Sequence, residues 1–160
     1  MASYARTLAG TALATGATAG LGSLATDPDS FWYRFLDTPD WQPPRWAFPV
    51  AWTALYGAIA HSSASALSTL REEGDDEEAE HLKRGLGVNL ALNAGWSYLF
   101  FQSKNPPLAA VGAAALAVSS ASLTRRVWRA RRSAGIVMAP YAAWTAFATA
   151  LSTSIAARNS

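Results

Sequence analysis

The sequence predicts an all-α fold, a bundle of five transmembrane helices that forms one domain over residues 1–160. The first observation is a set of five segments of 19 to 25 residues without Asp, Glu, Lys or Arg: 7–26, 46–70, 85–103, 106–124 and 133–157. A bilayer core of about 30 Å needs about 20 helical residues, so each segment is long enough to cross. The second observation is that 51% of the residues are apolar while the mean hydropathy is only slightly positive, because the charges are gathered between these segments.

A soluble, alanine-rich helical bundle is the first alternative to this fold. Five long helices without charges would then leave a very large apolar surface in water, which favours the membrane. Residues 7–26 follow Arg6 and have a signal peptide as their alternative, but the segment is long and rich in Gly and Thr. The sequence contains no Cys, which excludes disulfides, thiolate nucleophiles and cysteine-ligated metals.

The first two helices are expected at about 7–25 and 46–70. Asp27 precedes Pro28, and proline disfavours a helical conformation in the residue before it, so the first helix ends here. An ordered loop is expected at 27–45, because this connection is unusually rich in prolines and aromatic residues. They are Trp32, Tyr33, Pro39, Trp41, Pro43 and Pro44.

The remaining helices are expected at about 84–102, 106–126 and 133–157, with Pro106 opening the fourth. Residues 71–80 contain seven acids and predict a solvated connector without an assigned function. The basic cluster between the fourth and fifth helices indicates a topology determinant and a contact for phospholipids, not nucleic acid. Its members are Arg125, Arg126, Arg129, Arg131 and Arg132.

The distribution of Lys and Arg predicts the orientation of an integral cell-membrane protein. With five spans, the N-terminus and two of the connections share one side and carry nine Lys and Arg, whereas the other side carries four. The positive-inside rule then places the N-terminus in the cytoplasm. The loop 27–45 and the C-terminus are expected outside.

The five segments contain no ionisable carboxylate, which excludes proton-coupled pumps and acid–base hydrolases of the usual kinds. No metal site is predicted. His61 is most simply explained by a hydrogen bond to a neighbouring backbone carbonyl. It lies nine residues from Trp52, about 180° around the helix, and is therefore expected outside any pocket that contains Trp52.

Aromatic and polar residues share one face on three of the predicted helices. The three stripes are Trp52 and Tyr56; Asn89, Asn93, Trp96 and Phe100; and Tyr141, Trp144, Ala148 and Ser152. Interfacial belts or helix packing could explain such stripes, and Trp32, Trp41 and Trp46 fit a belt. Trp52 and Trp144 lie deeper, and Asn93 is near mid-span, where an unpaired amide is costly. These three residues favour an intramembrane pocket.

The sequence resembles the TspO/MBR family, also called tryptophan-rich sensory proteins or translocator proteins, over nearly the whole chain. The first part of the resemblance is carried by Trp32, Tyr33, Leu36, Pro39, Trp41, Pro43, Pro44, Phe48, Trp52, Leu55 and Tyr56. The second part is carried by Leu92, Asn93, Trp96, Ser97, Phe100 and Phe101, and by Pro140, Tyr141, Trp144, Phe147, Ala148 and Leu151.

The resemblance implies a homodimeric five-helix bundle that binds protoporphyrin IX or a heme-type tetrapyrrole as a ligand, with no obligatory cofactor. In some members sterols or benzodiazepine-type drugs bind. Light-dependent porphyrin degradation is implied as a secondary activity, with Trp52 and Trp144 matching the tryptophans that take part. The expected ligand-binding residues are Tyr33, Trp41, Pro43, Pro44, Phe48, Trp52, Tyr56, Asn93, Trp96, Phe100, Tyr141, Trp144 and Ala148.

Some positions depart from the family pattern. Asn89 stands where Gln is frequent, and Ser152 stands where Asn is usual. No Lys or Arg follows Tyr141 before Arg158, so the fifth helix lacks a sterol motif of the Leu/Val, Tyr, Lys/Arg type. Small-residue patterns for dimer formation occur as Gly16-x-x-x-Gly20 and as Ala109, Ala113 and Ala117. Binding or sensing, photochemical degradation and transport of tetrapyrroles or sterols remain the alternative functions.

Overall fold

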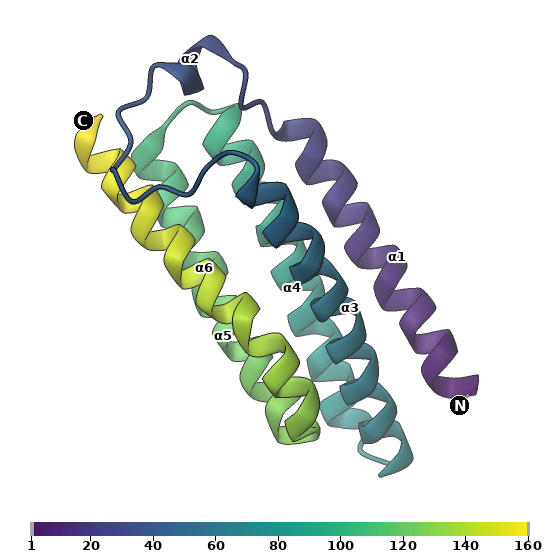
Figure 1. Ribbon diagram of the computed structural model, residues 1–160. Helices are drawn as coiled ribbons and strands as arrows, with labels where there is room; N and C mark the ends of the chain where they lie inside the picture. The colour runs from purple at the N-terminus through teal and green to yellow at the C-terminus, as the bar shows by residue number, and fades with distance from the viewer. Residues whose placement is uncertain (1, 160) are drawn as a thin grey trace.

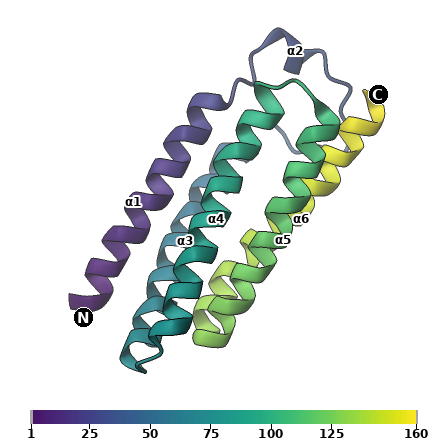
Figure 2. The ribbon, with the colours of Figure 1, turned by 180° about the vertical axis from the view of Figure 1, so that it is seen from behind.

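The computed structural model describes residues 2–159 as a bundle of helices, with no strand in that range (Figure 1). The six helices are α1 (Ala2–Ala25), α2 (Phe31–Arg34), α3 (Ala47–Glu72), α4 (Asp76–Phe101), α5 (Pro106–Ala130) and α6 (Arg132–Arg158). Five of them are long and run side by side, and the loop that carries α2 crosses one end of the bundle (Figures 1 and 2). The all-α class predicted from the sequence is confirmed.

Two helices begin earlier than the sequence analysis predicts. α1 starts at Ala2, not at residue 7. α4 starts at Asp76, not at residue 84, so residues 76–80 of the acidic connector are helical, as are residues 71 and 72 at the end of α3. Asp75 caps this helix by accepting a hydrogen bond from the Glu78 N–H at 3.1 Å, and the acids of the first turn lie at the positive end of the helix dipole.

Two of the described helices, α5 and α6, are long and apolar enough to cross a membrane by length and composition alone. The surface of the bundle is nevertheless apolar on the other long helices too. Large side chains that are exposed on α1, α3 and α4 include Leu13, Leu21, Leu24, Val50 and Val88. Aliphatic side chains on the outside of a bundle are typical of contact with lipid.

The interior contains many hydroxyl and amide side chains. Fully or almost fully buried polar residues include Thr7, Thr11, Thr15, Thr18, Ser62, Ser63, Asn89, Asn93, Ser120, Thr145 and Ser152. Several of these threonines donate to the carbonyl of the preceding helical turn, as Thr15 does to Thr11 at 2.9 Å. Helices in lipid associate through close packing and hydrogen bonds, because the hydrophobic effect does not drive them together there. Small hydroxyl residues at the interface allow both.

α1 lies at the edge of the bundle and packs against α3 and α4 (Figure 1). Its inward face is the row of four threonines, and Thr11 donates to the carbonyl of Ala60 across the interface at 2.8 Å. Arg71 on α3 donates to Thr7 at 2.8 Å, near the far end of the same interface. The contact surface of α1 is therefore polar, and its outward surface carries the leucines.

The end of the bundle at the α3–α4 turn has an aliphatic core. Its buried members include Leu67, Leu70, Leu82, Leu86, Leu123, Val127 and Met138. α5 and α6 come very close at their shared turn, where a Cβ added to Gly135 would lie 2.6 Å from Cα of Trp128. Only glycine fits at this position without a shift of the backbone.

His61 has a different partner from the one predicted. Its Nδ1 lies 2.6 Å from the Tyr4 hydroxyl of α1, and the two rings meet edge to face. The backbone carbonyls near a residue within a helix already accept hydrogen bonds from the helix itself. The His61 ring, at the α1–α3 interface, is therefore hydrogen-bonded to a side chain of α1 instead. His61 does not line the cavity that contains Trp52, as expected from their positions on α3.

Candidate ligand-binding site

A cavity of about 550 Å³ lies under the loop at the end of the bundle where α1 ends. It is lined from α1, the loop, α3, α4 and α6, and no α5 residue contributes. The 23 lining residues include nine aromatic side chains: Tyr33, Phe48, Trp52, Tyr56, Trp96, Phe100, Phe101, Trp144 and Phe147. This size and this apolar, aromatic lining are typical of a small-molecule site.

One wall is formed by α3 and α6, whose indoles meet. The Trp52 and Trp144 rings are perpendicular, at 88°, with centroids 6.3 Å apart. Tyr56, one turn after Trp52, lies with its ring centroid 5.6 Å from that indole, and Phe48 meets Trp144 at 5.9 Å. The helical spacing of four residues thus brings the aromatic stripes of two helices into one wall.

The opposite wall comes from α4 and the loop. Phe100 is buried, and its ring is met by Trp96 at 5.5 Å and by Tyr33 at 6.0 Å. The indole Nε1 of Trp96 and the amide oxygen of Gln42 are buried without a hydrogen-bond partner. Buried polar atoms without partners are costly, so a group that reaches either atom would be bound favourably.

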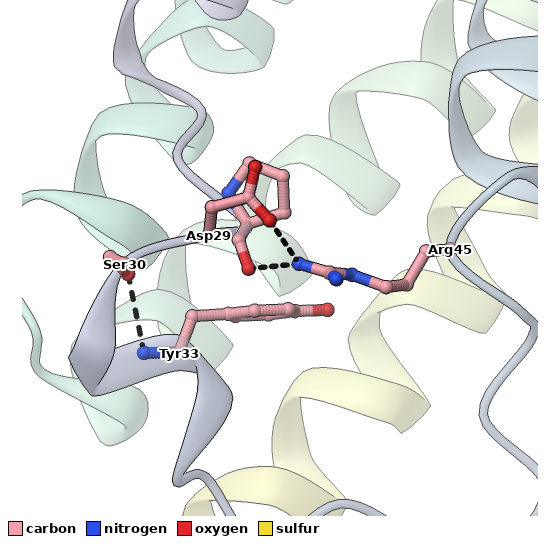
Figure 3. A network of polar contacts seen from close by, with 5 residues as sticks. Asp29, Ser30, Tyr33 and Arg45 are labelled. Carbon is pink, nitrogen blue, oxygen red and sulfur yellow. Dashed lines mark hydrogen bonds and ion pairs between the residues drawn. The ribbon is translucent and has the colours of Figure 1, made fainter.

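The loop is held closed over the cavity by a contact between its two ends. The Arg45 guanidinium donates to the carbonyl of Pro28 and to Oδ1 of Asp29, the latter at 3.0 Å (Figure 3). The Tyr33 ring lies beside this guanidinium (Figure 3). The backbone N–H of Tyr33 donates a hydrogen bond to the Ser30 hydroxyl, which caps the short helix α2 (Figure 3). Burial raises the pKa of Tyr33, while the nearby charge of Arg45 opposes the shift.

A second contact fixes the middle of the loop to the end of α6. The Asp37 N–H donates to Oδ1 of Asn159 at 3.0 Å, and Nδ2 of Asn159 donates back to the Asp37 carbonyl at 2.9 Å. Arg158 adds an ion pair to the Asp37 carboxylate at 3.7 Å. The loop is therefore attached to the bundle as well as to itself.

A chain of buried hydrogen bonds lies behind the Trp52 wall. Tyr56 donates to Oδ1 of Asn93 at 3.0 Å, and Nδ2 of Asn93 donates to the Tyr141 hydroxyl at 3.0 Å. Tyr141 donates in turn to Asn89 at 2.7 Å, and Asn89 donates to Ser120 at 3.0 Å. The chain joins α3, α4, α6 and α5, so it fixes these helices relative to one another.

The structure brings eight of the predicted ligand-binding residues into the cavity wall. They are Tyr33, Phe48, Trp52, Tyr56, Trp96, Phe100, Trp144 and Ala148. Asn93 and Tyr141 lie one layer behind, because both ends of the Asn93 amide are taken by tyrosines. Trp41, Pro43 and Pro44 are loop residues outside the lining, and the Trp41 ring packs on Phe147 at 5.8 Å.

Several lining residues have no counterpart in the sequence prediction. α1 contributes Ala19, Gly22 and Ser23, Thr26 follows directly after α1, and α6 adds Ile155. Small and hydroxyl residues on a span look like packing residues, so their composition gives no signal of a cavity. Arg45 is the one charged residue in the lining. Its position directly before the charge-free segment 46–70 is the feature of the sequence that could have indicated its place in the cavity lining. Among the described residues no three His, Asp or Glu side chains converge as metal ligands.

Comparison with known proteins gives the same family for most of the chain. The model of the TspO/MBR family matches residues 9–158. The tryptophan-rich sensory protein of Cereibacter sphaeroides is 33% identical over 138 residues, which cover 86% of this chain and 82% of that protein. The tryptophan-rich protein TspO of Chlorobaculum tepidum is 30% identical, with 82% of each chain covered, and the human translocator protein is 31% identical, with 75% and 70% covered. The chain belongs to the TspO/MBR family of membrane proteins.

Proposed function

We propose that this protein binds a planar tetrapyrrole of the protoporphyrin IX or heme type in the aromatic cavity beneath the loop. The observation that carries the proposal is the cavity of about 550 Å³ with nine aromatic side chains in its wall. Aromatic faces stack on a large π-system, and each stacked pair contributes about 0.5 to 1.5 kcal/mol beyond area burial. A flat hydrophobic ligand therefore gains most from this wall.

The polar groups of the cavity match the edges of such a ligand. Arg45 is the lining cation, and its guanidinium can pair with a carboxylate on the ligand in place of Asp29. The unpartnered Nε1 of Trp96 and amide oxygen of Gln42 offer one donor and one acceptor. Asn93 acts indirectly in this proposal, because its amide is used to hold Tyr56 and Tyr141.

Five membrane spans with the N-terminus in the cytoplasm and the C-terminus outside are part of the proposal. The exposed aliphatic side chains on α1, α3, α4, α5 and α6 and the nine-to-four asymmetry of Lys and Arg support it. A reporter that is active only in the cytoplasm should be inactive when fused after Ser160. Activity of that fusion would contradict the orientation.

A homodimer is also proposed, on the basis of the family resemblance. Ala109 and Ala113 are 0% and 1% exposed and pack within the bundle, so they are not available to a second copy. Gly16 and Gly20 on α1 are exposed, and a Cβ added at either position would meet no neighbouring helix within 4 Å, so they are the small-residue pattern that remains. Cross-linking in native membranes should therefore capture a dimer through α1, and recovery of monomer alone would contradict it.

Photochemical loss of the bound porphyrin is the second candidate activity. It is favoured by the contact of Trp52 with Trp144, since a light-excited porphyrin can take an electron or a hydrogen atom from an adjacent indole. Transport of the tetrapyrrole or of a sterol is the alternative. The cavity occupies one end of the bundle and the aliphatic core fills the other, an arrangement that favours binding over passage.

The test of the binding proposal is a titration of the purified protein with protoporphyrin IX, followed by Soret absorption and tryptophan quenching. A saturable signal at one equivalent per chain is expected. Trp46 is 70% exposed and outside the cavity lining, so Trp46→Phe provides a matched control that keeps the titration curve. A linear, unsaturable signal would mean that porphyrin only partitions into the detergent or lipid.

A further inference from the structure

We propose that a second site on this protein binds the headgroup of a zwitterionic phospholipid, a phosphate joined to a primary ammonium as in phosphatidylethanolamine. The site is a polar crevice of about 370 Å³ at the end of the bundle opposite the aromatic cavity. It lies between the turn that joins α3 to α4 and the last turns of α5. The inference does not depend on porphyrin binding.

The crevice has one basic and one acidic wall. Arg125, Arg126 and Arg129 follow one another at helical spacing on α5 and supply the basic wall. Glu73 and Asp75 flank Gly74, whose φ of 77° allows the sharp turn that brings both beside α5. With Glu78 the lining holds three arginines and three acids, so it is formally neutral as a whole.

Not all of these charges are used within the protein. Arg126 is paired with Glu78 at 2.6 Å, and the Asp75 carboxylate caps α4. Arg125 and Arg129, one turn apart, have no ion pair in the described residues, and both are exposed. The Glu73 carboxylate on the other wall has no ion pair there either.

This arrangement selects the chemistry of the ligand. Two guanidinium groups on adjacent turns bind a phosphate through charge-assisted hydrogen bonds. A free carboxylate across the crevice binds a primary ammonium, whereas it repels a ligand that carries only negative charge. A neutral crevice with separated walls therefore fits a phosphate and an ammonium that are a few bonds apart.

The position of the crevice points to a lipid as the source of this headgroup. The arginines directly follow the charge-free segment 106–124 of α5, which is long and apolar enough to cross a membrane. Trp128 is on the same turn, 41% exposed, with the Arg132 guanidinium 5.4 Å from its ring. Tryptophan beside arginine at the end of a span marks the headgroup layer of the bilayer.

The experiment is a native mass spectrometry titration of the full-length protein in detergent with phosphatidylethanolamine, phosphatidylglycerol and phosphatidylcholine of identical acyl chains. The affinity of the parent protein for phosphatidylethanolamine should be about tenfold or more above its affinity for either of the other lipids. A hydrogen bond to a charged group contributes enough free energy to change an affinity by about that factor. Equal affinity for the three lipids would overturn the proposal. Free phosphoethanolamine is titrated in parallel, and an affinity equal to that of the lipid would overturn the membrane source.

Two pairs of variants test the two walls. Arg129→Gln should weaken binding of all three lipids, whereas Arg131→Gln, in the same basic cluster but outside the crevice, should not. Glu73→Gln should abolish the preference for phosphatidylethanolamine over phosphatidylglycerol, whereas Glu77→Gln, in the same acidic run, should keep it. Equal effects within either pair would mean diffuse attraction of a charged surface and would overturn the site. Helical circular dichroism and the gel-filtration profile of each variant check that it is folded.

Discussion

The amide of Asn93 donates a hydrogen bond to the Tyr141 hydroxyl over 3.0 Å, and the two side chains are 2% and 0% exposed. The same amide accepts from Tyr56, whose ring packs against Trp52. One buried side chain on α4 thus holds two tyrosines from α3 and α6, and through them the back of the Trp52 wall. Removal of any member leaves a buried polar group without a partner.

Tyr56→Phe should lower the stability of the protein by about 1 kcal/mol or more, because it leaves Oδ1 of Asn93 unpaired in the core. Asn93→Leu should cost more, since it removes the partner of Tyr56 and one partner of Tyr141. The matched control is Tyr98→Phe, whose ring is 59% exposed. The measurement is the thermal midpoint of the purified variants. If Tyr56→Phe and Tyr98→Phe melt together, the hydrogen-bond chain contributes nothing.

Trp52→Phe and Trp144→Phe should separate affinity from photochemistry. Each variant keeps an aromatic face, so binding of protoporphyrin IX should weaken by about tenfold at most. Light-driven loss of the Soret band should slow much more, because phenylalanine is far harder to oxidise than tryptophan. Trp46→Phe, with its ring outside the cavity, is the control. Bleaching at the parent rate in both cavity variants would leave only a binding function.

Ala148→Leu should crowd the cavity and weaken porphyrin binding about tenfold or more, the effect expected of overpacking a filled site. The same substitution at Ala146, which is exposed on the opposite side of α6, should leave the titration unchanged. Both variants keep the helix propensity nearly constant. Equal affinity of the two would show that the ligand does not occupy the space beside Ala148.

Arg45→Gln should open the loop without destabilising the bundle. The Arg45–Asp29 pair is 57% and 86% exposed, so its contribution to the free energy of unfolding is small, about 0 to 1 kcal/mol. The thermal midpoint should therefore move little, while the rate of porphyrin release and the rate of protease cleavage within 27–45 should rise. Arg34→Gln on α2 is the control, since no ion pair of Arg34 is found in the described residues. Unchanged release in Arg45→Gln would mean that the loop does not limit exchange.

Gly135→Ala should destabilise the protein by about 1 to 3 kcal/mol, because the new methyl group would lie 2.6 Å from Cα of Trp128 and would force α5 and α6 apart. Gly57→Ala on α3 provides the opposite expectation. Nothing lies within 4 Å of the Cβ position there, so the gain in helix propensity should stabilise by about 0.5 to 1 kcal/mol. The thermal midpoints should thus shift in opposite directions, and a common direction would contradict the close contact at Gly135.

The helices were predictable because their signal is local. Charges are excluded from 46–70 and 133–157; α3 contains all of the first segment except its N-cap residue Trp46, and α6 contains the whole of the second. The early start of α4 was missed, since an acidic run is equally typical of a solvated loop and of the first turn of a helix, and only the Asp75 cap distinguishes them.

The cavity was predictable only in part. Trp52 and Trp144 were found because aromatic residues deep in a span are unusual, but the partner of a buried amide depends on which helix faces it. Asn93 was therefore expected to contact a ligand, whereas two tyrosines from other helices take both ends of its amide. Gly22 of α1 lines the cavity because of where α1 packs, which no pattern within α1 encodes.

The hydrogen bonds between Asp37 and Asn159 have a consequence for the order of assembly. They join residues 122 positions apart, so during synthesis the loop emerges long before its anchor exists. Contacts between residues so far apart in the sequence form late, because closing the long intervening chain costs conformational entropy. Trp144 and Ala148 of the cavity wall also belong to α6, so the cavity itself is incomplete while α3, α4 and α5 are being made. The last turn of α6 then attaches the middle of the loop, so the closed aromatic site is a late product of folding that requires the whole of α6.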